Sequence, residues 1–258
     1  MAPRNSLQIL ASSLVALVGT VAGAAPGARA EAWGSCPGSV RELADRSDRL
    51  TRGDSSEGIM SMRVYKRGIV SMRMKVWSKG RDKFLAKILA PSQLRGMSTL
   101  KSGDNLWNYL PKMDRILKLG SSMMGGSWMG SHFTNDDLVK ETDIRKHYTC
   151  VGHKDEGGDT VITVKPRPNA PVVWGKVVMR IQRGTAIPIW SRFYDERDRL
   201  SRTMRFEAVQ TMGGRTFPTR MVLQPADAPS ERTEVSFQRM KFDHRLDDSL
   251  FTLQGLKR

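Results

Sequence analysis

The sequence predicts a mainly β protein, built on one large, strongly curved antiparallel sheet with a few helices. From residue 60 onwards, apolar residues recur at every second position in run after run, which is the period of a strand with one buried face. Turn residues separate the runs and leave no room for crossover helices, so neighbouring strands are expected to be antiparallel. The chain contains no internal repeat and no low-complexity tract.

Residues 1–30 are predicted to be a cleavable export signal. Residues 7–25 are apolar and small, and residues 28–30 (Ala-Arg-Ala) have the small-x-small pattern of a signal peptidase site. We therefore expect a signal peptide over residues 1–30 and one exported domain over residues 31–258. Two alternatives remain open, namely a retained single-span anchor and a lipid attached to Cys36.

One helix is expected at the start of the exported domain. Val40, Leu43 and Ala44 recur at helical spacing. Ser39 is a suitable N-cap, because its hydroxyl can accept a hydrogen bond from the first-turn backbone. Gly53 is expected to end the helix.

The first strands are expected to form a hairpin. Residues 60–64 and 70–76 alternate between apolar and polar side chains on either side of a short break that contains Gly68. Further strands are expected over residues 84–90 and 106–110, each of which stops at a proline.

The second half of the chain repeats this pattern. Strands are expected at residues 161–165, 172–181, 187–194, 200–209, 215–223 and 233–242. Residues 212–214 (Met-Gly-Gly) lie between two alternating runs and predict a hairpin turn. The apolar phase slips between Phe237 and Met240, which predicts a β-bulge.

The middle of the chain departs from the strand pattern. Residues 123–133 are rich in glycine and large apolar side chains. Thr134 can cap a short helix whose first turn contains Asp136 and Asp137, a favourable place for carboxylates. This segment is expected to be either a lid over the sheet or a hydrophobic plug that seals one end of it.

The charge of the chain is strongly basic. The formal net charge is +16, and the loss of residues 1–30 would remove two arginines and no acid, which leaves +14. Such a field attracts anionic lipid headgroups or acidic polymers. Nucleic acid is not an expected partner, because the protein is exported and its basic residues are spread over many segments. A basic exterior that only keeps the protein in solution is the alternative.

Cys36 and Cys150 are the two cysteines of the chain. Export to an oxidising compartment favours a disulfide between them. A buried pair of free thiols is the alternative.

The sequence contains no recognisable catalytic or cofactor motif. Residues 125–130 depart from the nucleophile pattern G-x-S-x-G at Met129, and H-E-x-x-H, P-loop and dinucleotide patterns do not occur. We therefore expect no enzyme activity, no catalytic residue, no metal site and no cofactor.

Methionine is unusually frequent, with 15 residues in the chain. Methionines in the expected strands are Met60, Met62, Met72, Met74, Met179, Met204 and Met221. Flexible thioether side chains suit a surface that adapts to ligands of varied shape, and they also fill irregular cores. The strand period does not distinguish a cavity wall from a packed core.

The central residues closely resemble the bacterial outer-membrane lipoprotein-sorting protein family related to the LolA carrier. The segments that carry the resemblance are residues 103–111, Arg115, Leu117, residues 125–131, 133–134 and 136–138, with support from residues 83–91, 176–182 and 247–252. The resemblance implies a LolA/LolB-like fold, in which a curved antiparallel sheet forms an incomplete β-barrel, helices cover its open side and an apolar cavity lies between.

The resemblance also implies a periplasmic carrier for the acyl chains of lipoproteins or lipids, with an anionic membrane surface or an inner-membrane transporter as further partners. A lipid sensor or an interaction protein that binds an anionic partner without shuttling is the alternative. The candidate cavity residues are Met62, Val64, Met72, Met74, Trp107, Tyr109, Trp128 and Met129. Strand alternation leaves open whether Trp107 and Tyr109 point into the cavity or pack beneath the helices.

Overall fold

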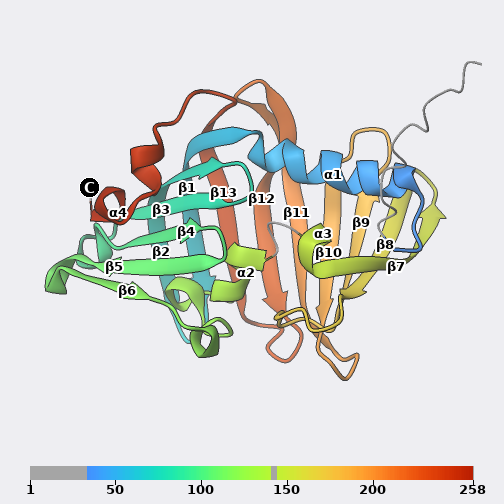
Figure 1. Cartoon of the computed structure of the whole chain (residues 1–258), viewed down its shortest axis with the longest axis horizontal. Helices are drawn as coiled ribbons and strands as arrows, with labels where there is room; N and C mark the ends of the chain where they lie inside the picture. The colour runs from blue at the N-terminus through green and yellow to red at the C-terminus, as the bar shows by residue number, and fades with distance from the viewer. Residues whose placement is uncertain (1–33, 141–143, 258) are drawn as a thin grey trace, which may run out of the picture. The chain divides into compact units, whose positions relative to one another are not determined.

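The computed structural model describes residues 34–140 and 144–257, and this part of the chain is mainly β (Figure 1). The signal peptide predicted for residues 1–30 lies outside the described residues. The strands are β1 (Ser55–Tyr65), β2 (Ile69–Lys79), β3 (Lys83–Ala90), β4 (Ser98–Ser102), β5 (Asn105–Leu110), β6 (Arg115–Lys118), β7 (Tyr148–Glu156), β8 (Asp159–Pro166), β9 (Lys176–Gln182), β10 (Pro188–Tyr194), β11 (Leu200–Met212), β12 (Arg215–Pro225) and β13 (Arg232–Phe242). The α-helices are α1 (Gly38–Arg52), α2 (Asn135–Lys140), α3 (Ile144–His147) and α4 (Leu253–Lys257). The 3-10 helices are η1 (Ser92–Leu94), η2 (Pro111–Met113), η3 (Ser121–Met123), η4 (Trp128–Gly130) and η6 (Asp248–Phe251).

All thirteen strands belong to one sheet, in the order β6-β5-β4-β3-β2-β1-β13-β12-β11-β10-β9-β8-β7. Two antiparallel meanders meet where β1 pairs with β13, and the sheet is not closed, because β6 and β7 are its two edges. The predicted curved antiparallel sheet is confirmed.

The junction of β1 and β13 contains the predicted bulge. Met60 pairs with Phe237 and Ile59 pairs with Arg239, so Gln238 has no partner residue in β1. A bulge bends its strand and increases the local twist. A Cβ atom at Gly58 would lie 2.1 Å from Sδ of Met240, so glycine at this position permits the close approach of the two strands.

Three strands were not expected, and one begins later than expected. β4, β6 and β7 do not show the apolar–polar alternation of a half-buried strand, because β4 and β6 are too short to show a period and β7 is mostly polar. β9 begins at Lys176 and not at Val172, because backbone hydrogen bonds hold residues 167–172 in a turn.

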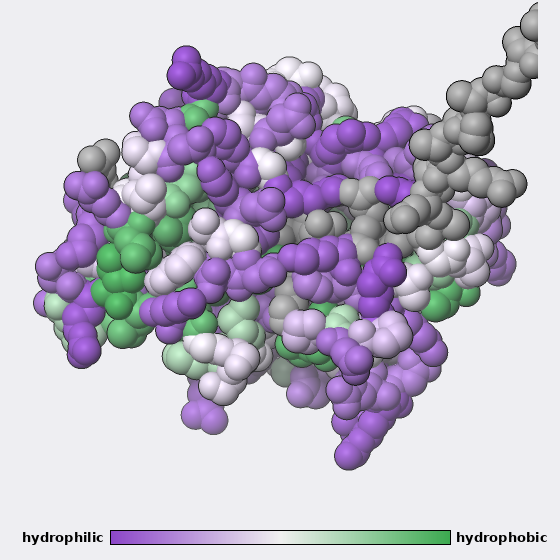
Figure 2. All heavy atoms as spheres, in the orientation of Figure 1, coloured by the Kyte–Doolittle hydropathy of each residue, from purple (hydrophilic) through white to green (hydrophobic). Residues whose placement is uncertain are grey.

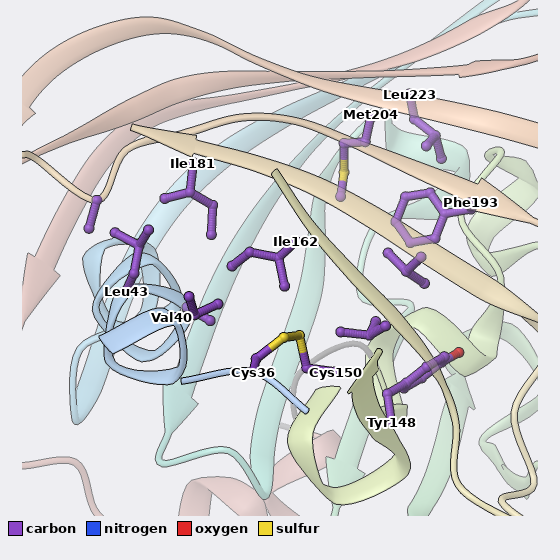
Figure 3. Close-up of a cluster of buried hydrophobic side chains, with 14 residues drawn as sticks. Cys36, Val40, Leu43, Tyr148, Cys150, Ile162, Ile181, Phe193, Met204 and Leu223 are labelled. Atoms are coloured by element: carbon purple, nitrogen blue, oxygen red, sulfur yellow. A yellow bond between two sulfur atoms is a disulfide. The ribbon is translucent and has the colours of Figure 1, made fainter. Parts of the chain in front are cut away.

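Helix α1 lies over the β9–β12 part of the sheet. Its residues Val40 and Leu43 share a buried cluster with Ile162 and Ile181 (Figure 3). The helix begins at Gly38 after Pro37, and no side chain caps it.

The prediction that Ser39 caps α1 is wrong, because the chain enters the helix earlier than expected. Ser39 therefore lies inside the first turn. Gly53 follows the last helical residue with a φ of 66°, which is the left-handed region that glycine adopts without strain. The predicted end of the helix is thus confirmed.

The strand order forces a long connection across the sheet. Residues 119–140 and 144–147 join β6 at one edge to β7 at the other, and we call them the crossing segment. They contain η3, η4, α2 and α3. The face of the sheet beneath α1 and the crossing segment is the inner face, and the opposite face is the outer face.

The C-terminal elements cover part of the outer face. Leu256 of α4 and Phe251 of η6 pack in one cluster with Leu85 and Leu100 of the sheet. Figure 2 shows hydrophobic residues gathered below α4, over the β4–β6 part of the sheet, while most of the remaining visible surface is hydrophilic. Asp248 accepts hydrogen bonds from Lys79 and Lys83, which lowers the pKa of its carboxyl group to about 2.

Cys36 and Cys150 form the predicted disulfide, with their Cα atoms 5.7 Å apart. The bond belongs to the buried cluster beneath α1 (Figure 3). It ties the start of α1 to β7, across 114 residues of sequence. Among the helices of the described residues, none is long and apolar enough to cross a membrane.

The disulfide should contribute strongly to stability. We expect the Cys36→Ala, Cys150→Ala double variant to lose about 4 kcal/mol in its free energy of unfolding, because the bond closes a long loop in the unfolded chain. Denaturation curves of the oxidised parent and the variant measure the loss. Thiol titration of the unfolded, non-reduced parent should detect no free thiol, and two reactive thiols per chain would contradict the bond.

Candidate ligand cavity

Two adjoining pockets lie on the inner face, and together we call them the inner hollow. The larger has a volume of about 280 Å³ and lies between the sheet, the end of α1 and the crossing segment. The smaller has a volume of about 180 Å³ and lies between α1 and strands β9–β11. Thr51 and Met204 line both pockets. Ligand sites typically have about 300–1,000 Å³, so the combined hollow is large enough for a small apolar group.

Apolar side chains form most of the wall of the larger pocket. Four methionines contribute to it, namely Met60, Met204, Met221 and Met240. The aromatic residues Phe84, Phe237, Trp128 and Phe133 also line it, the last two from the crossing segment. Flexible thioether side chains next to rings make a wall that can adapt to a ligand.

The charged groups near α1 are paired with one another. Asp48 accepts hydrogen bonds from Arg52 at 2.7 Å and from Arg81 at 2.9 Å. All three residues line the hollow. Their mutual neutralisation lowers the cost of placing an apolar group beside them.

Asp137 of α2 attaches the crossing segment to the sheet. Its carboxylate accepts hydrogen bonds from Nη1 of Arg202 at 2.6 Å and from Nη2 at 2.7 Å. The two side chains are only 3% and 5% exposed. The guanidinium also lies 4.2 Å from the ring centre of Trp174 and 4.3 Å from that of Phe193. A bidentate pair of this kind fixes both distance and orientation.

The same carboxylate organises the start of α2. The backbone N–H of Thr134 donates to Oδ2 of Asp137 at 2.7 Å, and the backbone N–H of Asp137 donates to Oγ1 of Thr134 at 3.2 Å. This reciprocal arrangement is a capping box. It confirms that Thr134 caps the helix.

Further contacts hold the glycine-rich part of the crossing segment. Nε1 of Trp128 donates to Oγ1 of Thr99 at 3.1 Å. His132 lies next to β13, where its Nδ1 is 2.8 Å from Oγ1 of Thr233 and its Nε2 is 3.0 Å from Oε2 of Glu231. The segment therefore lies over the inner face, as expected of a lid or a plug.

The structure separates the candidate cavity residues into several groups. Trp128 lines the larger pocket. Met62, Met72 and Met74 are at most 3% exposed and belong to a packed cluster on the same face. None of these three methionines is among the described residues that border the inner hollow. Val64 and Met129 lie together in a different groove near the β1–β2 turn.

Trp107 and Tyr109 lie on the outer face. Leu100 pairs with both Leu85 and Trp107 across neighbouring strands, so these three side chains share a face. Trp107 and Tyr109 pack against the cluster that contains Leu256 of α4. Strand alternation allowed Trp107 and Tyr109 to point into the cavity or to pack beneath the helices, and in the structure they pack beneath a helix.

Sequence analysis missed Arg202 as the partner of Asp137. A signal was present, because Arg202 occupies the same strand phase as Met204 and Phe206, both of which line the hollow. A charged residue in an apolar phase predicts a buried partner. Within the described ranges, no group of side chains is arranged to bind a metal ion.

A family model with the description "Uncharacterized protein" matches residues 80–258. No curated protein matches the chain. Among solved structures, a DUF1329 family protein from Desulfovibrio piger is 21% identical, with 83% of this chain and 96% of that chain covered and a TM-score of 0.73. A LolA superfamily protein from Nitrosomonas europaea is 21% identical, with coverage of 82% and 96% and a TM-score of 0.68.

A domain from Vibrio parahaemolyticus that is named for outer-membrane lipoprotein sorting is also similar. It is 23% identical, with 84% of this chain and 97% of that chain covered and a TM-score of 0.71. At this level of identity the similarity establishes a shared architecture. The LolA-like fold that the family resemblance implied is confirmed.

Loss of the buried ion pair should destabilise the protein. We expect Arg202→Met to lower the free energy of unfolding by about 3–5 kcal/mol, because Asp137 would remain buried without its counter-ion. The double variant Arg202→Met, Asp137→Asn should lose less. The control Arg199→Gln breaks an exposed pair with Asp195 and should cost under about 1 kcal/mol. Equal losses for Arg202→Met and Arg199→Gln in denaturation curves would contradict this role.

Packed and hollow-lining methionines should respond differently to truncation. Met74→Ala should lower the free energy of unfolding by about 2–5 kcal/mol, since Met74 is fully buried in a packed cluster. Met221→Ala should cost clearly less, because Met221 borders space that is already present. Chemical denaturation of the two variants makes the comparison, and a larger loss for Met221→Ala would show that this face is ordinary core.

Proposed function

We propose that this chain, which belongs to the family of uncharacterized proteins whose model matches residues 80–258, is a carrier that shields acyl chains of a lipoprotein or lipid during transfer through the bacterial envelope. The inner hollow is the observation that carries the proposal. Met60, Met221, Phe84 and Phe237 surround it with apolar surface, and an acyl chain gains about 0.8 kcal/mol for each methylene group removed from water.

The fold supports this choice. The chain has the LolA-like fold, and a domain of similar architecture is named for outer-membrane lipoprotein sorting. In the proposal the sheet supplies the cargo wall, and α1 and the crossing segment cover it. Cargo binding by this mechanism needs no catalytic residue and no cofactor.

We place the carrier in the periplasm. The predicted signal peptide would deliver residues 31–258 there, and the disulfide between Cys36 and Cys150 suits an oxidising compartment. The proposed partners are the acyl chains themselves, an anionic membrane surface and an inner-membrane transporter that loads the carrier. The basic charge favours the first contact with anionic lipid.

The anchoring of the crossing segment favours a second candidate function. Asp137 and His132 bind this segment to β11 and β13, so an acyl chain beneath it could be retained instead of passed on. The protein would then be an envelope lipid sensor. Transfer of a bound probe to acceptor vesicles identifies a carrier, whereas retention of the probe identifies a sensor.

Acyl binding in the hollow can be tested with cis-parinaric acid, whose fluorescence rises in an apolar site. The parent should bind the probe, and Met221→Trp should weaken binding at least about fivefold, because extra volume in a filled site costs about 1–3 kcal/mol. The control Val209→Trp places the same ring at a side chain that is 47% exposed and should bind as the parent does. A parent that shows no saturable fluorescence would overturn the proposed function.

A further inference from the structure

The turn between β1 and β2 exposes two aliphatic side chains. We call residues 65–70 the hairpin tip. Ile69 is 67% exposed and Val70 is 50% exposed, which makes Ile69 the most exposed large hydrophobic residue of the described chain. Adjacent aliphatic residues at the end of a hairpin are costly to leave in water, so this position calls for a partner that takes them up.

Apart from Glu57, which pairs with Lys75 at 2.9 Å, the charged residues of the same hairpin are positive. From Gly58 to Arg81 inclusive, the sequence has seven lysines and arginines and no acidic residue. Four cations are exposed near the tip, namely Arg63, Lys66, Arg67 and Arg73. Within residues 34–140 and 144–257, no carboxylate forms a salt bridge with any of these four. A further cation, Arg232, stacks 3.7 Å from the ring centre of Tyr65.

The acidic groups that face the hairpin are already engaged. Glu234 is paired with Arg232 at 2.7 Å and with Arg220 at 3.1 Å. Glu231 contacts His132. The four exposed cations therefore project an uncompensated field around the two aliphatic side chains.

A groove connects the hairpin tip with the crossing segment. It has a volume of about 320 Å³ and is lined by Val64, Val70 and Met129, with Lys66 and Arg67 beside them. Nζ of Lys66 donates a hydrogen bond to the carbonyl of the next residue after Met129, Gly130, at 3.0 Å. Trp128, which precedes Met129 in the sequence, lines the inner hollow. Adjacent residues of the crossing segment therefore line the groove and the hollow.

Met129 has a strained backbone at this groove. Its φ is 49°, in the left-handed region that costs a non-glycine residue about 1–3 kcal/mol. Glycine would relieve this cost, whereas methionine supplies a flexible apolar wall to the groove. Strained residues of this kind gather at ligand sites.

Aliphatic side chains surrounded by cations match the chemistry of one surface in particular. In an anionic bilayer, phosphate groups lie a few ångströms outside the acyl chains, so the cations and the aliphatic tip can be satisfied together. An acidic protein would need an apolar pocket among its carboxylates to do the same, whereas every anionic bilayer combines the two.

We propose that the hairpin tip and the adjoining groove dock the protein on an anionic lipid bilayer, with Ile69 and Val70 inserted at the acyl boundary and the cations on lipid phosphates. The proposal rests on the proposed carrier function, because docking would bring the hollow to the membrane that gives or receives cargo. It adds the place and the chemistry of that contact.

Vesicle co-sedimentation tests the docking site. The parent should bind vesicles of phosphatidylcholine mixed with phosphatidylglycerol, and bind much less to phosphatidylcholine alone. Arg63→Gln, Arg67→Gln should weaken binding about fivefold for each cation removed. Ile69→Ser, Val70→Ser should weaken it at least about tenfold, since both side chains lose their insertion energy. Added salt should weaken binding of the parent.

Matched variants elsewhere separate a local site from general basicity. Arg239→Gln, Lys241→Gln removes two exposed cations at the far end of β13, opposite Ile59 and Glu57, and Val151→Ser, Val209→Ser removes two exposed aliphatic residues of β7 and β11. Both should bind vesicles as the parent does. Equal losses in the hairpin and control variants, or no binding to anionic vesicles by the parent, would overturn the docking site.

The acyl probe keeps the two proposals distinct. The hairpin variants should bind cis-parinaric acid as tightly as the parent, because they leave the inner hollow unchanged. Probe binding without vesicle binding would overturn the docking site and leave the carrier proposal standing. Vesicle binding without probe binding would overturn the carrier proposal and leave the docking site standing. Capture of an acidic protein by the parent, with no vesicle binding, would assign the hairpin to a protein partner and overturn the bilayer proposal.

Discussion

The contact between Asp137 and Arg202 is the constraint on which the arrangement of the inner face depends. The strand order places β6 and β7 at opposite edges of the sheet, so the crossing segment must run over a largely apolar surface. A chain can do this only where its polar groups find partners. Asp137 supplies several, because it caps α2 and pairs with Arg202 inside the protein. The positions of Trp128 and Phe133, and with them the wall of the hollow, depend on that attachment.

The inner hollow results from incomplete coverage of a curved face. Helix α1 packs on the β9–β12 part of the sheet, whereas the crossing segment packs on the part around β1 and β5. Between them the apolar face is lined but not filled, and Met204 borders both pockets. Next to the hollow, Met62 and Met74 are fully buried. Within β1, Met60 therefore borders the hollow, whereas Met62 belongs to the packed core.

Strand alternation separates charge from apolar surface within one hairpin. Met62 and Met72 point to the inner face, while their sequence neighbours Arg63 and Arg73 are exposed on the outer face. The same period of two thus builds an apolar interior and a basic exterior. At the hairpin tip the two kinds of surface meet, because the sheet ends there and nothing in the described chain covers Ile69.

The sequence alone determined the features that depend on near neighbours. Alternation predicted the hairpins and the bulge after Phe237, and Thr134 was recognisable as a cap, because a strand phase and a helix start are local properties. Only the tertiary structure decided what covers each face. Trp107 had two possible orientations, and α4 covers the outer one. Arg202 meets Asp137 across 65 residues. A period of two defines two faces of a strand, but burial, pairing and empty space arise from distant segments that pack against those faces.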